Sequence, residues 1–107
     1  MILSNKIKWS DLFREDNFYS DIVKAVVDIE QSIIAVEAEW HADLELELIE
    51  AGSFSRNLWG INFHHNFMEI EYDSLINIKP NQNRSMTVEC HNTRERIKKI
   101  CEQWIVE

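Results

Sequence analysis

The sequence predicts an α+β fold, a two-layer sandwich in which helices pack on one face of a mainly antiparallel sheet of about four strands. Three observations indicate it. Two β-branched runs lie within residues 25–38, two further strand-like runs lie within residues 57–78, the later of them alternating apolar with polar residues, and an amphipathic helix lies near the C-terminus. The expected order is α-β-β-α-β-β-α, in which pairs of consecutive strands alternate with single helices. A chain of 107 residues with two glycines and one proline fits a single domain over residues 1–107.

The first half is expected to form a helix, a hairpin and a second helix. Partial helical spacing around Leu12 and Phe13 predicts a helix over residues 9–20. The β-branched runs Ala25–Ile29 and Ile33–Ala38 flank Glu30-Gln31-Ser32, so we expect a hairpin, although the connection lacks an Asn-Gly turn.

The segment HADLELELIEAG at residues 41–52 alternates leucine with acidic residues, as a strand would, but its residue types are strong helix formers. Two apolar stripes follow the helical repeat: Leu44, Leu48 and Ala51 in one, and Ala42, Leu46 and Ile49 in the other. Gly52 falls where a left-handed C-cap is needed. We therefore predict a helix over residues 41–51 that is buried on more than one side.

The second half is expected to form two strands and a helix. Residues 57–63 and 68–78 are joined by His64-His65-Asn66, and in the later strand apolar and polar side chains alternate. One apolar face and one polar face predict helices on one side of the sheet. The last helix starts near Asn92, and its apolar side chains follow i, i+3, i+4, i+7: Ile97, Ile100, Cys101, Trp104 and Ile105.

The charge distribution restricts the classes of partner. The net charge is −8, and residues 1–53 carry twelve Asp or Glu against four Lys or Arg. An acidic chain repels phosphate backbones, so a nucleic-acid partner is not expected, apart from a local basic pole near the C-terminus. Neither a membrane span nor a secretory signal is evident, and two cysteines are too few for a disulfide scaffold, so we expect a cytoplasmic protein.

The sequence lacks the motifs of nucleophilic catalysis, phosphate binding and metal binding. The sequence has neither the G-x-S-x-G nucleophile elbow nor a glycine-rich phosphate loop. His41 and Asp43 form an H-x-D pair, and His64 and His65 are adjacent, but neither spacing supplies the three or four converging ligands that zinc needs. No metal site and no cofactor are therefore expected.

The polar face of the predicted sheet is the candidate site. If the strands pair, Asn62 shares a face with Asp73 and Asn77, the following loop can fold back over it, and His41 and Asp43 can complete a pocket. The candidate binding residues are Asp43, Asn62, Asp73, Asn77, Arg84 and Ser85. The alternative is that these groups satisfy backbone atoms at strand ends and in the loop, without any ligand.

The sequence resembles a family of short bacterial proteins catalogued as a domain of unknown function. The similar segments are HAD at 41–43, GS at 52–53, LWGIN at 58–62, DSLINIKP at 73–80 and NRS at 83–85, together with VKAVVDIEQSIIAV at 23–36 and RERIKKI at 94–100. The resemblance spans roughly residues 20–105, and the first twenty residues and FSR at 54–56 depart from it. It supports the fold class, supplies no mechanism, and implies for some members a position beside toxin–antitoxin genes.

These observations favour a non-enzymatic, macromolecule-binding module whose partner is a protein. The acidic N-terminal half would steer a basic partner toward it. Trp9 and Trp40 lie at element edges where a partner could cover them. An antitoxin-like role would suit the acidic charge of the N-terminal half. A homodimer is compatible with the sequence. The alternative is a small metal-independent nuclease-like or ligand-processing enzyme with His41, Asp73 and Arg84 as its catalytic residues.

Overall fold

The structure, a computed structural model, describes residues 1–13 and 22–107. Its strands are β1 (Ile7–Lys8), β2 (Val23–Asp28), β3 (Ile33–Val36), β4 (Leu58–Phe63), β5 (Ile70–Glu71) and β6 (Ile105–Val106). Its α-helices are α1 (Trp9–Leu12), α2 (His41–Glu50) and α3 (His91–Trp104), and two 3-10 helices are η1 (Ser55–Asn57) and η2 (Leu75–Asn77). The predicted α+β class is confirmed.

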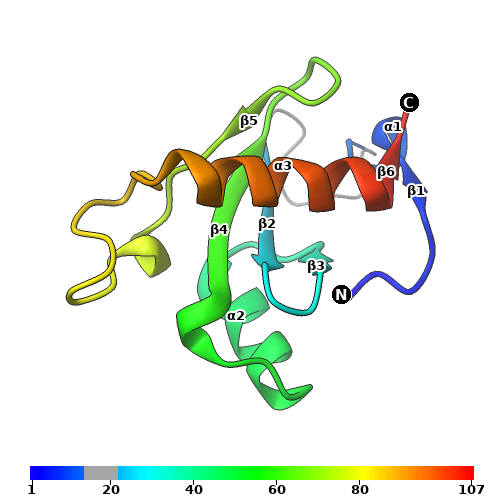
Figure 1. Cartoon of the computed structure of the whole chain (residues 1–107). Coiled ribbons are helices and arrows are strands. Elements are labelled where there is room, and N and C mark those ends of the chain that lie inside the picture. The colour runs from blue at the N-terminus through cyan, green and yellow to red at the C-terminus, as the bar shows by residue number, and fades with distance from the viewer. Residues whose placement is uncertain (14–21) are drawn as a thin grey trace.

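A four-stranded antiparallel sheet with the order β3-β2-β4-β5 forms the centre of the molecule (Figure 1). The predicted hairpin of β2 and β3 is confirmed, with Val26 opposite Ala35, and β4 pairs with β2 along its whole length. β1 and β6 make a separate parallel pair, which brings the first and last strands of the chain together.

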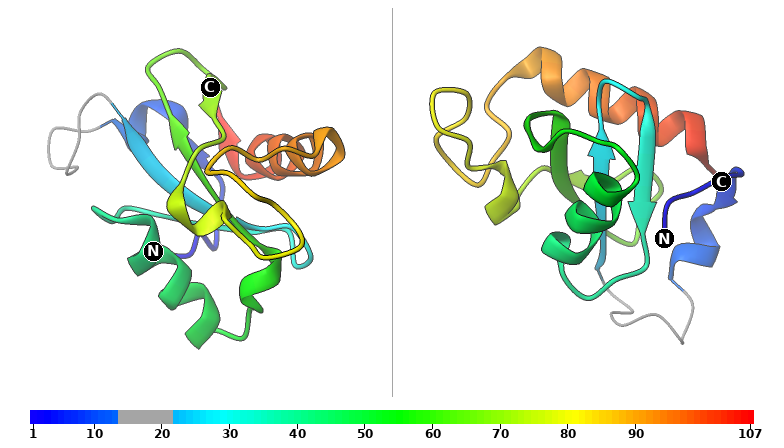
Figure 2. Two further views of the ribbon diagram at one scale, coloured as in Figure 1. Left: turned by 90° about the vertical axis from the view of Figure 1, so that its left-hand side faces the viewer. Right: turned by 90° about the horizontal axis from the view of Figure 1, so that it is seen from below.

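The two long helices lie on opposite faces of this sheet, so the prediction that helices cover one face is wrong. Figure 2 shows α2 on one side of the strands and α3 on the other. Val27 and Ile61 belong to the core on the α3 face, which includes Ile97 of that helix. Val26, which precedes Val27 in β2, packs on the other face against Leu44 and Leu48 of α2. The physical reason is that β2 contains the apolar run 25–27 and β3 is apolar throughout, and continuous apolar runs are typical of strands buried on both faces.

The β2–β3 turn is held by a side chain. The Asp28 carboxylate accepts hydrogen bonds from the backbone N–H groups of Glu30 and Gln31, at 2.9 and 3.0 Å, and from the Ser53 hydroxyl at 2.6 Å. Ser32 adopts a φ of 57°. An aspartate that satisfies the N–H groups two and three residues later replaces the missing Asn-Gly pair.

Helix α2 confirms the helical interpretation of residues 41–51. It ends at Glu50. Gly52, two residues later, has a φ of 111°, and the N–H of Ser53 donates to Leu48 O at 2.9 Å. Its burial is narrower than expected: Leu44 and Leu48 are fully buried, but the second stripe faces outward, with Leu46 55% exposed. The prediction that α2 is buried on more than one side is therefore wrong.

The segment predicted as a strand over residues 68–78 is a strand only at β5. Met68 has a φ of 59°, which delays the strand, and Ser74 Oγ accepts a hydrogen bond from the N–H of Ile76 as the chain turns into η2. The alternation therefore breaks: Tyr72 packs against the core on the α3 face, and Ile76 packs on the α2 face.

At the N-terminus, helix α1 begins at Trp9 as predicted and ends at Leu12, with Phe13 as its C-cap, and residues 14–20 of the predicted helix 9–20 lie outside the described residues. Trp9 is buried, and its indole N–H donates to His65 O at 3.0 Å, so it is a core residue and not an edge open to a partner. In the described parts of the chain, no helix is both long and apolar enough to cross a membrane.

Candidate binding pocket on the α2 face of the sheet

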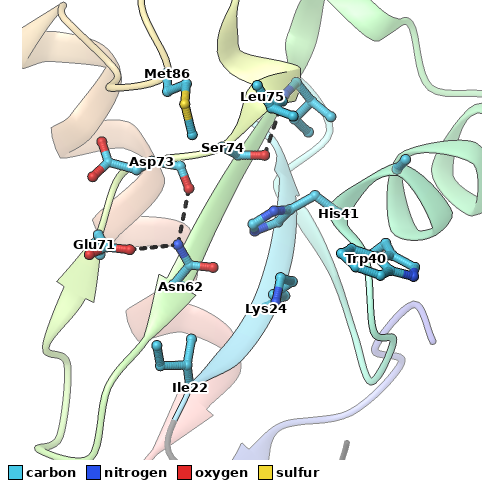
Figure 3. Close-up of a pocket in the computed structure, with 12 residues that line it drawn as sticks. Ile22, Lys24, Trp40, His41, Asn62, Glu71, Asp73, Ser74, Leu75 and Met86 are labelled. Carbon is cyan, nitrogen blue, oxygen red and sulfur yellow. Dashed lines mark hydrogen bonds between the residues drawn. The ribbon is translucent and has the colours of Figure 1, made fainter. Parts of the chain in front are cut away.

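A pocket of about 490 Å³ opens where the N-terminus of α2 meets the β4–β5 edge (Figure 3). α2 covers only part of its face of the sheet, and the segment from β5 through η2 forms the opposite wall. Its lining residues are Ile22, Lys24, Trp40, His41, Ala42, Asn62, Glu71, Asp73, Ser74, Leu75, Ile76 and Met86.

The walls of this pocket are large apolar side chains that water reaches. Trp40 is 57% exposed, Leu75 is 71% exposed and Met86 is 45% exposed. Trp40 stands beside His41 on the α2 side, while Leu75 and Met86 lie across the opening. Scattered exposed apolar residues are ordinary in folded proteins, but a group gathered around one hollow is typical of an interaction site.

The polar groups at its base are organised by Asn62 of β4. The Asn62 side-chain Nδ2 donates to Glu71 Oε1 at 2.8 Å and to the main-chain oxygen of Asp73 at 3.0 Å. Asp73 therefore presents its carbonyl to Asn62, while its carboxylate points away and accepts a hydrogen bond from Thr87 Oγ1 (Figure 3). Both amide protons of Asn62 are thus committed within the fold.

His41 begins α2 and extends from it toward β4. Its Nε2 lies 2.8 Å from the main-chain oxygen of Ile61. Since a carbonyl oxygen only accepts, Nε2 must carry the proton and donate it. Burial lowers the pKa of His41, and nearby Lys24 lowers it further, although the hydrogen bond to Ile61 opposes them. The imidazole is therefore neutral at pH 7, where it serves as an aromatic wall and a donor.

Gly60 makes room for this arrangement. A Cβ atom at position 60 would lie 2.5 Å from Ser74 Cβ, far closer than van der Waals contact, and 3.1 Å from His41 Cδ2, a few tenths of an ångström too close. The absence of a side chain at Gly60 lets η2 and α2 approach β4 from the two sides of the pocket. Gly60 thus allows Ser74 and His41, which line the pocket, to approach β4 closely, although Gly60 is not itself a lining residue.

The remaining candidate residues separate into structural and peripheral ones. Asn77 is fully buried and bonds to both backbone groups of Gly60, so it fixes η2 to the sheet edge. Ser85 Oγ donates to Thr87 O at 3.1 Å within the loop. Asp43 and Arg84 are exposed and do not line the pocket. The structure therefore brings His41, Asn62 and Asp73 together, and leaves Asp43, Arg84 and Ser85 outside.

Apart from His41, Asn62, Asp73 and Trp40, the sequence does not point to the lining residues as members of a site. Glu71 was placed on the polar strand face without a role, and Lys24 was assigned only to the hairpin region. Leu75 and Met86 look like ordinary strand and loop residues, because their exposure depends on η2 and on a non-local turn. Trp40 carried a usable signal, a tryptophan at an element edge.

A further hollow of about 410 Å³ lies below η2 and contains the buried Lys79. The Lys79 ammonium donates to Ser55 O at 2.9 Å and to Ile76 O at 3.2 Å, and lies 5.0 Å from the centre of the Trp59 ring. Burial lowers its pKa. These contacts connect η1 to η2. The Lys79 ammonium therefore has a structural role.

The described residues do not form a metal-binding cluster. Within residues 1–13 and 22–107, no group of three or more His, Cys, Asp or Glu side chains is placed to hold an ion. His64 Nε2 lies 3.7 Å from Glu71 Oε2, which makes a partly exposed pair at the outer end of the hairpin.

Comparison with known proteins gives one match. No curated protein and no solved structure matches the chain. The model of the family described as "Protein of unknown function (DUF5674)" matches residues 1–104, so it includes the first twenty residues that the resemblance above left out. With nearly the whole length matched, the chain belongs to this family of proteins of unknown function.

Proposed function

We propose that this protein is a binding module and that the pocket receives an apolar side chain of a protein partner. The observation that carries the proposal is the exposure of Trp40, Leu75 and Met86 around one opening of about 490 Å³. Mostly apolar hollows with a few fixed polar groups are the usual form of binding sites. Tryptophan is also enriched among the residues that contribute most binding energy at the centre of protein interfaces.

The polar groups at the base favour binding over catalysis. The Asn62 amide protons are used by Glu71 and Asp73, and the His41 Nε2 proton by Ile61. A general acid must give a proton to the substrate, whereas the Asn62 amide protons and the His41 Nε2 proton are already engaged in holding the walls in place. The pocket is preorganised, which lowers the entropic cost of taking up a side chain.

The alternative, a metal-independent nuclease-like or ligand-processing enzyme, would use His41, Asp73 and Arg84. Of these, His41 lines the pocket, the Asp73 carboxylate bonds with Thr87, and Arg84 lies outside the lining. Growth arrest on expression of the wild type that is abolished by both His41→Ala and Arg84→Ala would favour the enzyme. No toxicity would favour the binding module.

An antitoxin-like or accessory role is one setting for such a module, because it would supply a dedicated protein partner. The acidic charge of the N-terminal half suits a basic partner.

A peptide-display selection against the immobilised protein tests the binding function directly, with a random library as the probe. The pocket variant Trp40→Ala/Leu75→Ala is compared with the wild type, and Phe67→Ala, another exposed aromatic residue remote from the pocket lining, is the matched control. Both variants are first checked for native circular dichroism.

We expect enriched peptides to share a large apolar residue, to bind the wild type and the Phe67→Ala control equally, and to bind the pocket variant at least about tenfold more weakly, as loss of an interface hot spot implies. Peptides that bind the pocket variant as well as the wild type, or no enrichment at all, would contradict the proposal.

A further inference from the structure

Helix α2 carries an apolar stripe that the fold leaves uncovered. Ala42, Leu46 and Ile49 follow the spacing i, i+4, i+7, so they lie on one side of the helix. Leu46 is 55% exposed and Ile49 is 39% exposed, while Leu44 and Leu48 on the other side fill the core. Two large aliphatic side chains on the outside of a ten-residue helix contribute nothing to the fold's interior.

The stripe is continuous with the pocket. Ala42, its first member, lines the pocket, and so does Trp40, the residue before α2. Figure 3 shows Trp40 and His41 at the point where α2 begins. One apolar surface therefore runs from the opening between Leu75 and Met86, past Trp40, and along the outer side of α2.

Acidic side chains border this stripe on both sides. By helical geometry, Asp43, Glu47 and Glu50 lie along one flank, and Glu45 lies along the other. Asp43 and Glu50 are exposed, and Glu47 is in contact with the N-terminal amine of Met1. An apolar line between rows of carboxylates attracts a partner with cations on both sides of its own apolar face.

We propose that this surface, the pocket together with the outer side of α2, binds a basic amphipathic helix of a partner protein. The inference rests on the proposed binding function and specifies the partner's chemistry. The backbone groups of α2 are already hydrogen-bonded within the helix, so a partner has only side chains to pack against. A second helix meets that requirement, placing one large apolar residue in the pocket and the following ones along the stripe.

The same charges argue against a second copy of this chain as the occupant. Two copies that meet through the α2 stripe would bring Asp43 and Glu50 of each chain near acidic side chains of the other. Like charges at an interface oppose association, whereas lysines or arginines on the partner helix would neutralise them.

Fluorescence anisotropy with two labelled synthetic peptides tests this partner. The first is an amphipathic helix about 20 residues long, enough to span α2, with leucines on one side and lysines on both flanks. The second has every lysine replaced by glutamate. The variants are Leu46→Ser/Ile49→Ser in the stripe and Asp43→Asn/Glu50→Gln on the flank, at fixed ionic strength because exposed charges are screened by salt.

Matched controls separate a specific surface from the general acidity of the chain. Glu102→Gln/Glu107→Gln removes the same number of charges from exposed positions away from α2, and Val106→Ser removes an exposed aliphatic side chain from β6. The pocket variant Trp40→Ala/Leu75→Ala is measured in parallel.

We expect the basic peptide to bind, and its affinity to fall about tenfold or more for the stripe, flank and pocket variants, with less than about twofold change for either control. Equal binding of the acidic peptide, or an equal effect of the Glu102/Glu107 control, would overturn the basic-helix partner. If the peptides enriched by display lose affinity in the pocket variant but not in the stripe variant, this inference fails while the binding function stands. Self-association of the protein abolished by Leu46→Ser/Ile49→Ser would also overturn it, in favour of a second copy.

Discussion

Asn77 pairs with Gly60 through both ends of its carboxamide. The Gly60 N–H donates to Asn77 Oδ1 at 2.7 Å, and Asn77 Nδ2 donates to the Gly60 carbonyl at 3.0 Å. The side chain thus hydrogen-bonds to the β4 edge as an adjoining strand would, at the place where β5 has already ended. It also donates to Met86 O at 3.0 Å, which joins the two segments that form the far wall of the pocket.

Replacing Asn77 with alanine is expected to destabilise the protein by about 3 kcal/mol, because it removes the Asn77 partners of the buried Gly60 N–H and carbonyl groups. Urea denaturation followed by circular dichroism measures the change. Asn5→Ala, at an exposed asparagine, is the control and should change stability by less than about 0.5 kcal/mol. Similar stabilities for the two variants would show that the pairing is dispensable.

The close approach of Ser74 to Gly60 predicts a coupled pair of substitutions. Gly60→Ala places a methyl group 2.5 Å from Ser74 Cβ and should cost about 1–3 kcal/mol through overpacking. Ser74→Gly removes the atoms that collide, so it should recover part of that loss in the double variant, although Gly60→Ala still crowds His41. A double-mutant cycle with thermal denaturation measures the coupling, and strictly additive effects would contradict the contact.

The Asp28 carboxylate predicts loss of stability in acid. Burial alone would raise the pKa of Asp28, but hydrogen bonds from Ser53, Gln31 and Glu30 bring it below its usual value. A folded-state pKa below the unfolded one adds stability at pH values above the unfolded pKa of about 3.9, and this stability disappears as pH falls through the folded pKa.

Asp28→Asn should therefore be less stable than the wild type at pH 7 by about 1–2 kcal/mol and should lose less stability than the wild type between about pH 5 and about pH 3. Urea titrations at the two pH values measure both quantities, with Glu102→Gln as the exposed control. The same acid dependence in Asp28→Asn and the wild type would exclude this carboxylate as its source.

The two cysteines should differ in reactivity. Cys90 is exposed just before α3, and hydrogen bonds with Thr93 lower the pKa of its thiol, whereas burial raises the pKa of Cys101. Because the thiolate is the reactive form, a disulfide reagent at pH 7 should modify Cys90 quickly and Cys101 only after unfolding. Cys90→Ser should leave no rapidly reacting thiol in the native protein. Rapid reaction of this variant would show that Cys101 is accessible.

Much of the fold could be predicted from local patterns because the relevant signals lie within single elements. Gly52, with its positive φ, follows the end of α2, and α3 follows its apolar repeat. The N-cap of α3 is Cys90, two residues before Asn92, where the capping pattern placed it. The prediction that helices cover one face of the sheet is wrong because it rests on residues 68–78 alone. The polar face of that segment was taken to represent the same face of every strand. Val26 and Ala35 show that the hairpin is apolar on both sides.

The candidate site was predicted only in part, and the errors have one cause. Asn62, Asp73 and His41 were placed together because strand pairing and the start of a helix determine their positions. The conformation of the loop that contains Arg84 and Ser85 depends on Asn83. This side chain is buried and donates to the carbonyl oxygens of Asn77, Ser85 and Thr87. Those bonds join parts of a loop without local periodicity, so the outward position of Arg84 could not be inferred from spacing.

The most direct test of the pocket as the binding surface is NMR mapping of amide and indole resonances as a display-enriched peptide is added. We expect the largest changes at the Trp40 indole N–H and at the backbone amides of Leu75 and Met86, with smaller changes along the outer side of α2. If these resonances stayed unchanged while those around Lys98 and Lys99 of α3 shifted, the partner would bind on the opposite face of the sheet and the account would be wrong.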